Sequence, residues 1–154
     1  MRASTLMARR RHLSRIAVMQ ALFEREKRPS GAAMDSLVRN ASELGDLDLA
    51  FAELLLKGII QKEGDLQAAI QEHAPGWSMD RMDPIARPVL LLGAFELLYG
   101  NDAPPPVVMN ECIEIAKEYG TDETGKFVNG VLNAIAHNRP HSQSPTPSRA
   151  EHQP

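Results

Sequence analysis

Apolar residues along this chain recur every three or four positions, which is the period of an amphipathic helix. No segment of useful length shows the strict alternation of apolar and polar residues that predicts a β-strand. The pattern predicts long helices and shorter ones between them, over residues 8–28, 34–44, 51–59, 66–70, 83–99, 107–119 and 123–137. We therefore predict an all-α fold.

Two of these helices are too apolar to lie on a surface. Placed at about 100° per residue, the apolar side chains of residues 16–23 cover nearly every face of the first helix. The run at residues 89–95 is equally apolar and belongs to the fifth helix. We expect the first helix to be a buried spine whose basic N-terminal turns project beyond the core. The fifth should be the central buried helix.

Glycine and proline predict where the helices end and where they pack closely. Gly45 closes the second helix, and Asp46 or Asp48 can cap the third. Pro88 lies near the start of the fifth helix and should bend its first turn or delay it, and residues 104–106 form a stiff connector. Gly130 should allow close packing of the last helix. The third helix should bury one stripe and cross a neighbour closely at its glycine, through Phe51, Leu54, Leu55, Gly58 and Ile59.

The length of 154 residues fits one domain with a modest core. We expect a basic flexible N-terminus at residues 1–8, a single helical domain at 9–138 and a disordered, proline-rich tail at 139–154. No apolar run approaches the roughly 18 residues that a membrane helix needs, and the basic N-terminus lacks the apolar region of a secretory signal. The single cysteine, Cys112, fits a reducing compartment. We predict a cytoplasmic protein with no membrane contact.

The net charge of −3 hides an uneven distribution. Of the 17 Lys and Arg residues, eight lie in residues 1–28, where Glu24 and Glu26 are the acidic residues; the remaining chain is strongly acidic. An acidic body with a basic end can present one localised phosphate-binding patch. The alternative is a basic end that only aids solubility.

The residue types that support catalysis are not arranged for it. The five histidines and the one cysteine do not follow metal-ligand spacings, and Glu111 and Glu114 fit a solvated helix face. There is no glycine-rich phosphate loop, no GxSxG and no HExxH. We predict a protein that is not an enzyme and that has no cofactor and no metal.

RNA-binding chemistry is better represented. Arginine combines a permanent charge with a planar group that grips phosphates and stacks on bases, and four arginines gather near the start of the chain: Arg9, Arg10, Arg11 and Arg15. At the other end, Lys126 and Phe127 lie at the start of the last helix, where free backbone N–H groups favour phosphate. Phe127 either stacks on an unpaired base or belongs to the core, and the second reading is favoured.

Two blocks carry a family resemblance. Residues 110–132 read NECIEIAKEYGTDETGKFVNGVL, and residues 11–15, RHLSR, run into AVMQALF at 17–23. These blocks resemble the C-terminal part and the arginine-rich first helix of the NusB antitermination family. The resemblance extends over residues 9–136. It implies a NusB-like fold in which two small helical bundles pack around a central buried helix.

The resemblance also implies partners and contact residues. Family members bind the boxA element of ribosomal leader RNA together with the ribosomal protein NusE, and the complex joins RNA polymerase to suppress termination. Carried over by position, the RNA contacts are Arg9, Arg10, Arg11, Arg15, Asp122, Glu123, Thr124, Lys126 and Phe127. The NusE surface corresponds to Asp80, Asp83, Ala86 and Arg87. The chain departs from the family here, because Ala86 stands where some members carry an acidic residue. The alternative is a helical protein-interaction module of this fold without RNA binding, which the arginines at positions 9–11 argue against.

Overall fold

Helices make up nearly all of the regular structure in a computed structural model that describes residues 2–29, 31–100 and 102–138, with side chains from Thr5 onward. A short 3-10 helix, η1 (Met79–Arg81), precedes α5. The described residues contain no strand, which confirms the all-α prediction. The helices are α1 (Arg2–Lys27), α2 (Ala33–Leu44), α3 (Leu49–Gln61), α4 (Glu63–Glu72), α5 (Ala86–Leu98), α6 (Pro105–Tyr119) and α7 (Asp122–Asn138). The predicted tail at 139–154 lies outside the described residues.

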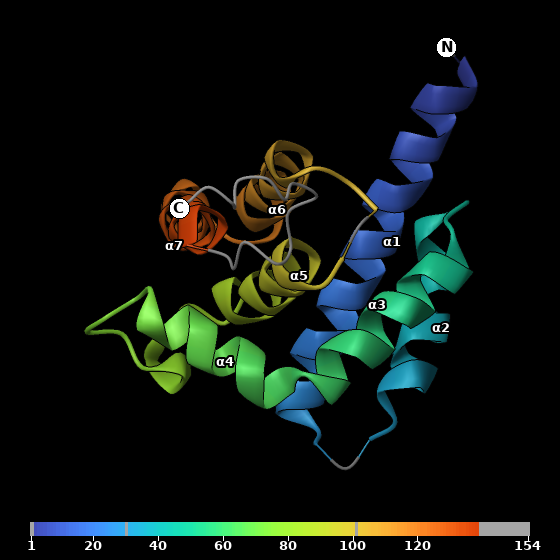
Figure 1. Ribbon diagram of the computed structural model, residues 1–154. Coiled ribbons are helices and arrows are strands. Elements are labelled where there is room, and N and C mark those ends of the chain that lie inside the picture. The colour runs from blue at the N-terminus through green and yellow to red at the C-terminus, as the bar shows by residue number, and fades with distance from the viewer. Residues whose placement is uncertain (1, 30, 101, 139–154) are drawn as a thin grey trace, which may run out of the picture.

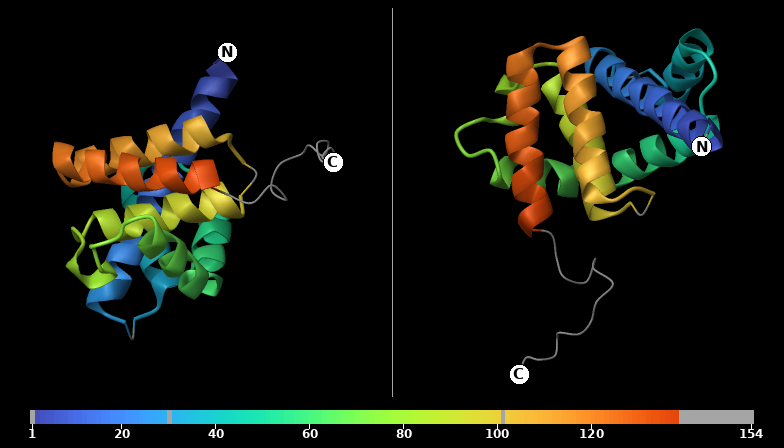
Figure 2. Two further views of the ribbon diagram at one scale, coloured as in Figure 1. Left: turned by 60° about the vertical axis from the view of Figure 1, so that its left-hand side comes forward. Right: turned by 90° about the horizontal axis from the view of Figure 1, so that it is seen from above.

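The helices form two groups that meet at α5. One group contains α1, α2 and α3, which pack against one another, and the other contains α5, α6 and α7. In addition α5 packs against α1, α3 and α4, so it joins the two groups (Figure 1). Helices α6 and α7 run antiparallel, side by side (Figure 2). The predicted arrangement of two small bundles around a central helix is confirmed.

The centre of the fold depends on how tightly α5 is covered. Ten of its 13 residues are buried. A Cβ atom added to Gly93 would lie 2.6 Å from Leu132 Cδ1 and 3.1 Å from Cys112 Sγ, so glycine lets α6 and α7 approach the backbone of α5. A Cβ on Gly58 would overlap the ring of Phe95, which confirms the predicted close crossing of α3. Glycine at these two positions therefore sets the spacing between the helices.

The start of α5 follows from its prolines. The helix begins at Ala86, later than the predicted residue 83, and Pro88 falls in its first turn. Backbone N–H groups in a first turn have no acceptor within the helix, so the N–H group that proline lacks costs no helical hydrogen bond there. The carboxylate of Asp83 accepts hydrogen bonds from the backbone N–H groups of Ile85 at 2.8 Å and Ala86 at 3.3 Å. The predicted delay of the regular helix at Pro88 is confirmed, and Asp83 caps the turn that precedes α5.

The projecting end of α1 extends the first helix beyond its predicted start at residue 8. The helix begins at Arg2, so the segment expected to be flexible, residues 1–8, is helical from its second residue. It extends beyond the body of the molecule (Figure 1), and Leu6 and Met7 are 53% and 56% exposed. Further along, Ile16, Met19 and Leu22 are buried, as the all-round apolar pattern predicts.

Three smaller expectations were wrong. Leu54 is 71% exposed, because α3 turns Ala52 and Leu56 toward the core instead. Gly130 faces open space, so it serves no close packing. The connector at residues 104–106 is partly helical, since α6 begins at Pro105, where the missing N–H of proline costs no hydrogen bond. In the described part of the chain, no helix is long and apolar enough to cross a membrane.

Candidate nucleic-acid interface

Three of the predicted arginines lie on the accessible part of α1. Arg9 is exposed and has no ion-pair partner among the described residues. Arg10 donates to the carbonyl oxygen of Leu47 at 3.0 Å, and its Nε lies 3.4 Å from Asp46 Oδ1. Two of these positions, 9 and 10, are therefore open to a ligand, although Arg10 is tethered on one side.

Arg11 is held from three sides. Its Nε lies 3.5 Å from Asp48 Oδ2, its Nη1 pairs with Asp102, and its guanidinium lies 4.1 Å from the centroid of the Phe51 ring. About a quarter of the side chain is exposed, at 25%. A phosphate that reached Arg11 would compete with two carboxylates.

Arg15, predicted as an RNA contact, is buried instead of lying on the accessible part of α1. It is 2% exposed, and its Nε and Nη2 donate to the two carboxylate oxygens of Glu96 at 2.6 and 2.8 Å. Burial alone would lower the pKa of Arg15, but its hydrogen bonds to Glu96 and the charge of that carboxylate outweigh burial and raise it. The side chain remains charged and holds α1 against α5, and it is closed to any ligand.

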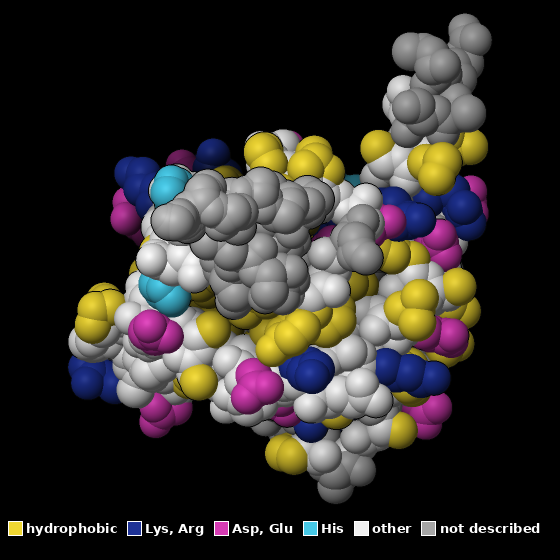
Figure 3. All heavy atoms as spheres, viewed as in Figure 1, with side chains coloured by type: hydrophobic (Ala, Val, Ile, Leu, Met, Phe, Trp, Pro, Cys, Tyr) yellow, Lys and Arg dark blue, Asp and Glu magenta, His cyan; other side chains and the backbone are white. Residues whose placement is uncertain are grey.

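The basic end of the chain is therefore less basic than its sequence indicates. Acidic and basic side chains intermix where the projecting end of α1 meets the body (Figure 3). Arg10, Arg11 and Arg15 each face at least one carboxylate, contributed by Asp46, Asp48, Glu96, Asp102 and Glu111. Arg9 alone, among the predicted arginines, carries a charge that no described carboxylate neutralises.

The second predicted region, the start of α7, is built on a reciprocal cap. Thr124 Oγ1 accepts from the backbone N–H of Thr121 at 3.1 Å, and Thr121 Oγ1 accepts from that of Thr124 at 3.2 Å. Thr124 also donates to Asp83 Oδ2 at 3.1 Å and is 3% exposed. The hydroxyl group of Thr124 is therefore committed to hydrogen bonds inside the fold, which leaves its predicted RNA contact little polar surface.

The other residues at the start of α7 face solvent. Asp122 and Glu123 are exposed. Lys126 is 74% exposed and its Nζ lies 3.6 Å from Glu123 Oε2, an ion pair weak enough for a phosphate to replace. Phe127 is half-buried, so neither reading of the sequence describes it fully: one part of the ring packs on the core and the other is accessible.

An aromatic pocket adjoins Phe127. The ring of Trp77 meets that of Phe127 edge to face, with centroids 5.8 Å apart, and Trp77 is 51% exposed. The cavity between them measures about 470 Å³ and is lined by Trp77, Met82, Asp83, Thr121, Glu123, Thr124, Lys126 and Phe127. Sequence reasoning missed Trp77, although a lone tryptophan directly after Pro75 and Gly76 in a loop was the signal for it.

The predicted partner surface lies beside this pocket. Asp80 and Asp83 are exposed, and Arg87 is held by Glu26 at 3.0 Å and by the carbonyl oxygen of Met82 at 2.7 Å. Ala86, predicted as a partner contact, is completely buried and presents no surface to a partner in this structure. Because Asp83 lines the pocket and binds Thr124, the predicted partner surface and the start of α7 form one continuous region.

The two predicted RNA regions lie toward opposite ends of α5. Arg15 on α1 binds Glu96, near the end of α5, whereas Arg87, at its start, binds Glu26 near the end of α1. The 13 residues of α5 span about 20 Å at 1.5 Å per residue. A single ligand that contacts both regions must therefore be an extended one.

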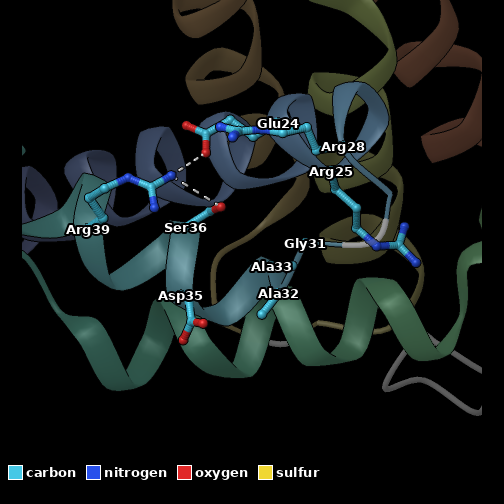
Figure 4. Close-up of a pocket in the computed structure, with 9 residues that line it drawn as sticks. All are labelled: Glu24, Arg25, Arg28, Gly31, Ala32, Ala33, Asp35, Ser36 and Arg39. Atoms are coloured by element: carbon cyan, nitrogen blue, oxygen red, sulfur yellow. Dashed lines mark hydrogen bonds and ion pairs between the residues drawn. The ribbon is translucent and has the colours of Figure 1, made fainter.

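A second hollow lies where α1 ends and α2 begins. It measures about 230 Å³ and contains arginines and carboxylates together (Figure 4). Arg39 turns to Glu24, with 2.6 Å between Nη2 and Oε1, and Arg25 reaches away to Glu63 at 2.8 Å. Two of its arginines are thus already paired with glutamates, one of them outside the hollow, whereas the lysine at the Trp77 pocket has a single weak ion pair.

One group of possible metal ligands was missed by the sequence. His12 Nδ1 lies 2.8 Å from Glu111 Oε1, and Glu114 stands one turn further along α6. Glu111 lies 99 positions after His12 in the sequence, and Glu114 lies further still. No local spacing in the sequence therefore indicates this group. Cys112, next to Glu111, is buried, and burial raises the pKa of its thiol well above the usual value.

Comparison with known proteins places the chain in a family. The NusB family model matches residues 12–137. The transcription antitermination protein NusB of Caulobacter vibrioides is 38% identical over 138 residues, covering 82% of this chain and 91% of that protein. The NusB protein of Bacillus subtilis is 36% identical over 126 residues, covering 82% and 94%.

Solved structures give the same result. The structure of T. maritima NusB superposes with a TM-score of 0.77 at 34% identity, over 86% of this chain and 94% of that one. A chain from the crystal structure of antitermination factors NusB and NusE in complex with dsRNA has a TM-score of 0.75 at 25% identity, over 84% and 97%. With its matching fold and with relatives above 30% identity along most of its length, this chain belongs to the NusB family.

Proposed function

We propose that this chain is a cytoplasmic transcription antitermination factor that binds boxA-like single-stranded RNA together with NusE, as part of the RNA polymerase antitermination complex. Family membership supports the general role. The observation that carries the RNA-binding part is the half-exposed aromatic pocket beside an exposed lysine at a helix N-terminus. We argue from this pocket because the arginine-rich end is largely neutralised.

The pocket has the parts that an unpaired base requires. Single-stranded RNA is recognised by stacking its bases on aromatic rings and by hydrogen bonds to their edges. Trp77 and Phe127 supply the rings, and the exposed carboxylate of Asp83 can accept from a base amino group. Lys126, with the N–H groups at the start of α7, favours the adjoining phosphate. In this proposal Asp122 and Glu123 border the bound strand.

The arginines on α1 form a second contact for the same strand. Arg9 and Arg10 hold phosphates, and Arg11 contributes where RNA displaces Asp102. Arg15 acts as a positioning residue, because its bond to Glu96 fixes the part of α1 from which the other arginines extend. The separation of about 20 Å estimated from the length of α5 suits several nucleotides of an extended strand.

NusE is proposed to dock beside the pocket, over Asp80, Asp83 and Arg87. Asp83 belongs to both surfaces, since it lines the pocket and caps the turn before α5. A partner that orders this turn also orders the wall of the base pocket, so each ligand should strengthen the binding of the other. Asp80 is exposed, and a charge reversal there should weaken NusE binding only slightly.

The test is a titration of fluorescein-labelled boxA-like RNA with the full chain, with and without the NusE of the same organism, over a series of salt concentrations. We expect saturable binding that tightens with NusE and weakens as salt rises. A scrambled single strand of equal length is the control. Binding of NusE without any RNA binding would support the alternative, a helical protein-interaction module, which the ion-paired arginines favour.

A further inference from the structure

Helices α1 and α6 bring three metal-ligating side chains together beside the arginines. The ligand atoms of His12, Glu111 and Glu114 all lie within 4.8 Å of one another. His12 and Glu111 are mostly buried, with 22% and 19% of their side chains exposed, whereas Glu114 is exposed. Two largely buried ligands and one exposed ligand thus form a site that opens to solvent on one side.

The charges around this site favour a cation. Arg11 and Arg15 are the cations of the surrounding network, and they face more carboxylates than they can neutralise: Asp48, Glu96, Asp102 and Glu111. Glu114 adds a further negative charge at the edge. Arg15 Nη1 lies 3.7 Å from Glu111 Oε1, yet Arg15 is committed to Glu96 through two hydrogen bonds. A divalent cation would reduce this surplus of negative charge.

We propose that His12, Glu111 and Glu114 form a binding site for Zn²⁺ that joins α1 to α6. An imidazole with two carboxylates selects a transition metal over Mg²⁺ or Ca²⁺, which prefer oxygen ligands alone. Ligand atoms on a tetrahedral Zn²⁺ ion lie about 3.4 Å apart, given bond lengths near 2.1 Å. The observed hydrogen bond of 2.8 Å between His12 and Glu111 must therefore open slightly, and the exposed Glu114 must swing inward.

The site would hold the arginine-bearing part of α1 against α6. His12 directly follows Arg11, so a metal at His12 would fix the turns of α1 that carry Arg9 and Arg10. The fourth coordination position would remain open to solvent, as in zinc sites with three protein ligands. This inference does not depend on RNA binding, since the ligands and the geometry are those of the chain alone.

The experiment is a calorimetric titration of the chelator-treated full chain with ZnCl2, supported by the visible absorption of bound Co²⁺. We expect one saturable site. His12→Ala and Glu114→Gln should each weaken binding by at least about tenfold, because even the loss of a residue behind a ligand has that effect. Glu118→Gln, on the same helix but outside the group, is the matched control and should bind as the native chain does.

Circular dichroism should show unchanged helix content in both ligand variants. Glu114 is exposed, so its variant tests the site even if His12→Ala loosens α1. The proposal is overturned by the absence of saturable Zn²⁺ binding to the native chain. It is equally overturned by binding that Glu114→Gln and His12→Ala leave intact, which would place the metal at another histidine such as His137.

Discussion

The two ends of the proposed RNA surface differ in how their charges are used. At the arginine-rich end of α1, Arg10 and Arg11 face Asp46, Asp48 and Asp102. At the start of α7 one lysine, 74% exposed, stands beside an apolar pocket with a single weak ion pair. The arginine-rich end of α1 thus offers little more unpaired positive charge than the start of α7, which has a single lysine.

This difference shows that the number of basic residues overestimates phosphate binding where carboxylates of the protein already neutralise those residues. A phosphate binding at Arg11 must displace a carboxylate, and the energy of that exchange is only the difference between two ion pairs. Stacking at Trp77 and Phe127 replaces water alone, because both rings are already partly exposed. We therefore expect the aromatic pocket to contribute more affinity, and the arginines to contribute salt dependence and orientation.

The largest expected effect is on stability, and it distinguishes Arg15 from the other arginines. Arg15→Ala should lower the free energy of unfolding by about 3–5 kcal/mol, because it leaves the charge of Glu96 buried without a partner. Urea denaturation followed by circular dichroism measures the loss. Arg9→Ala is the control and should leave stability unchanged. Native-like stability in Arg15→Ala, combined with weaker RNA binding, would return Arg15 to the RNA-binding surface.

The second effect tests the pocket directly. Trp77→Ala and Phe127→Leu should each weaken RNA binding by about 1–3 kcal/mol, the range observed for base stacking on an aromatic residue. Leucine keeps apolar contact with the core while removing the ring of Phe127. Leu54→Ala, at an exposed position on α3, is the matched control. Equal affinities in all three variants would show that the pocket holds no base.

Much of the fold follows from local patterns in the sequence. The all-round apolar segment at residues 16–23 predicted the buried spine, and Pro88 predicted the late start of α5. These features depend on neighbours within a turn or two, so periodicity and proline chemistry are sufficient. The misplaced stripe of α3, with Leu54 turned to solvent, shows the limit: when apolar residues cover more than one face, packing partners decide which face is buried.

The site required contacts that no local pattern contains. Arg15 meets Glu96 across 81 positions, and Thr124 meets Asp83 across 41. Each pairing converted a predicted RNA contact into part of the framework. Arg15 carried a usable signal, since it directly precedes the apolar segment and so lies within the buried length of α1. For Thr124 and Trp77, the decisive information was which loop lies beside the start of α7.

The third effect distinguishes free from neutralised charge. Arg9→Ala should reduce the slope of log affinity against log salt by about 0.7, the value for one phosphate contact on a single strand. Arg10→Ala should reduce it less, because Asp46 already neutralises part of that charge. Anisotropy titrations from low to moderate salt provide the slopes. Equal reductions by the two variants would mean that the bound RNA displaces Asp46 completely.

The smallest expected effect on RNA affinity comes from neutralising acidic residues instead of basic ones. Glu123→Gln frees Lys126 from its exposed ion pair, and Asp46→Asn frees Arg10. Both should raise RNA affinity at low salt by less than about threefold, because exposed pairs are weak, and the gain should fade as salt rises. Glu123→Gln should give the larger gain, since Arg10 stays bound to the carbonyl oxygen of Leu47 at 3.0 Å after Asp46 is neutralised. A larger gain in RNA affinity from Asp46→Asn would indicate that only its carboxylates limit phosphate binding at the arginine-rich end of α1. The end of α1 and the start of α7 would then contribute through the same electrostatic mechanism.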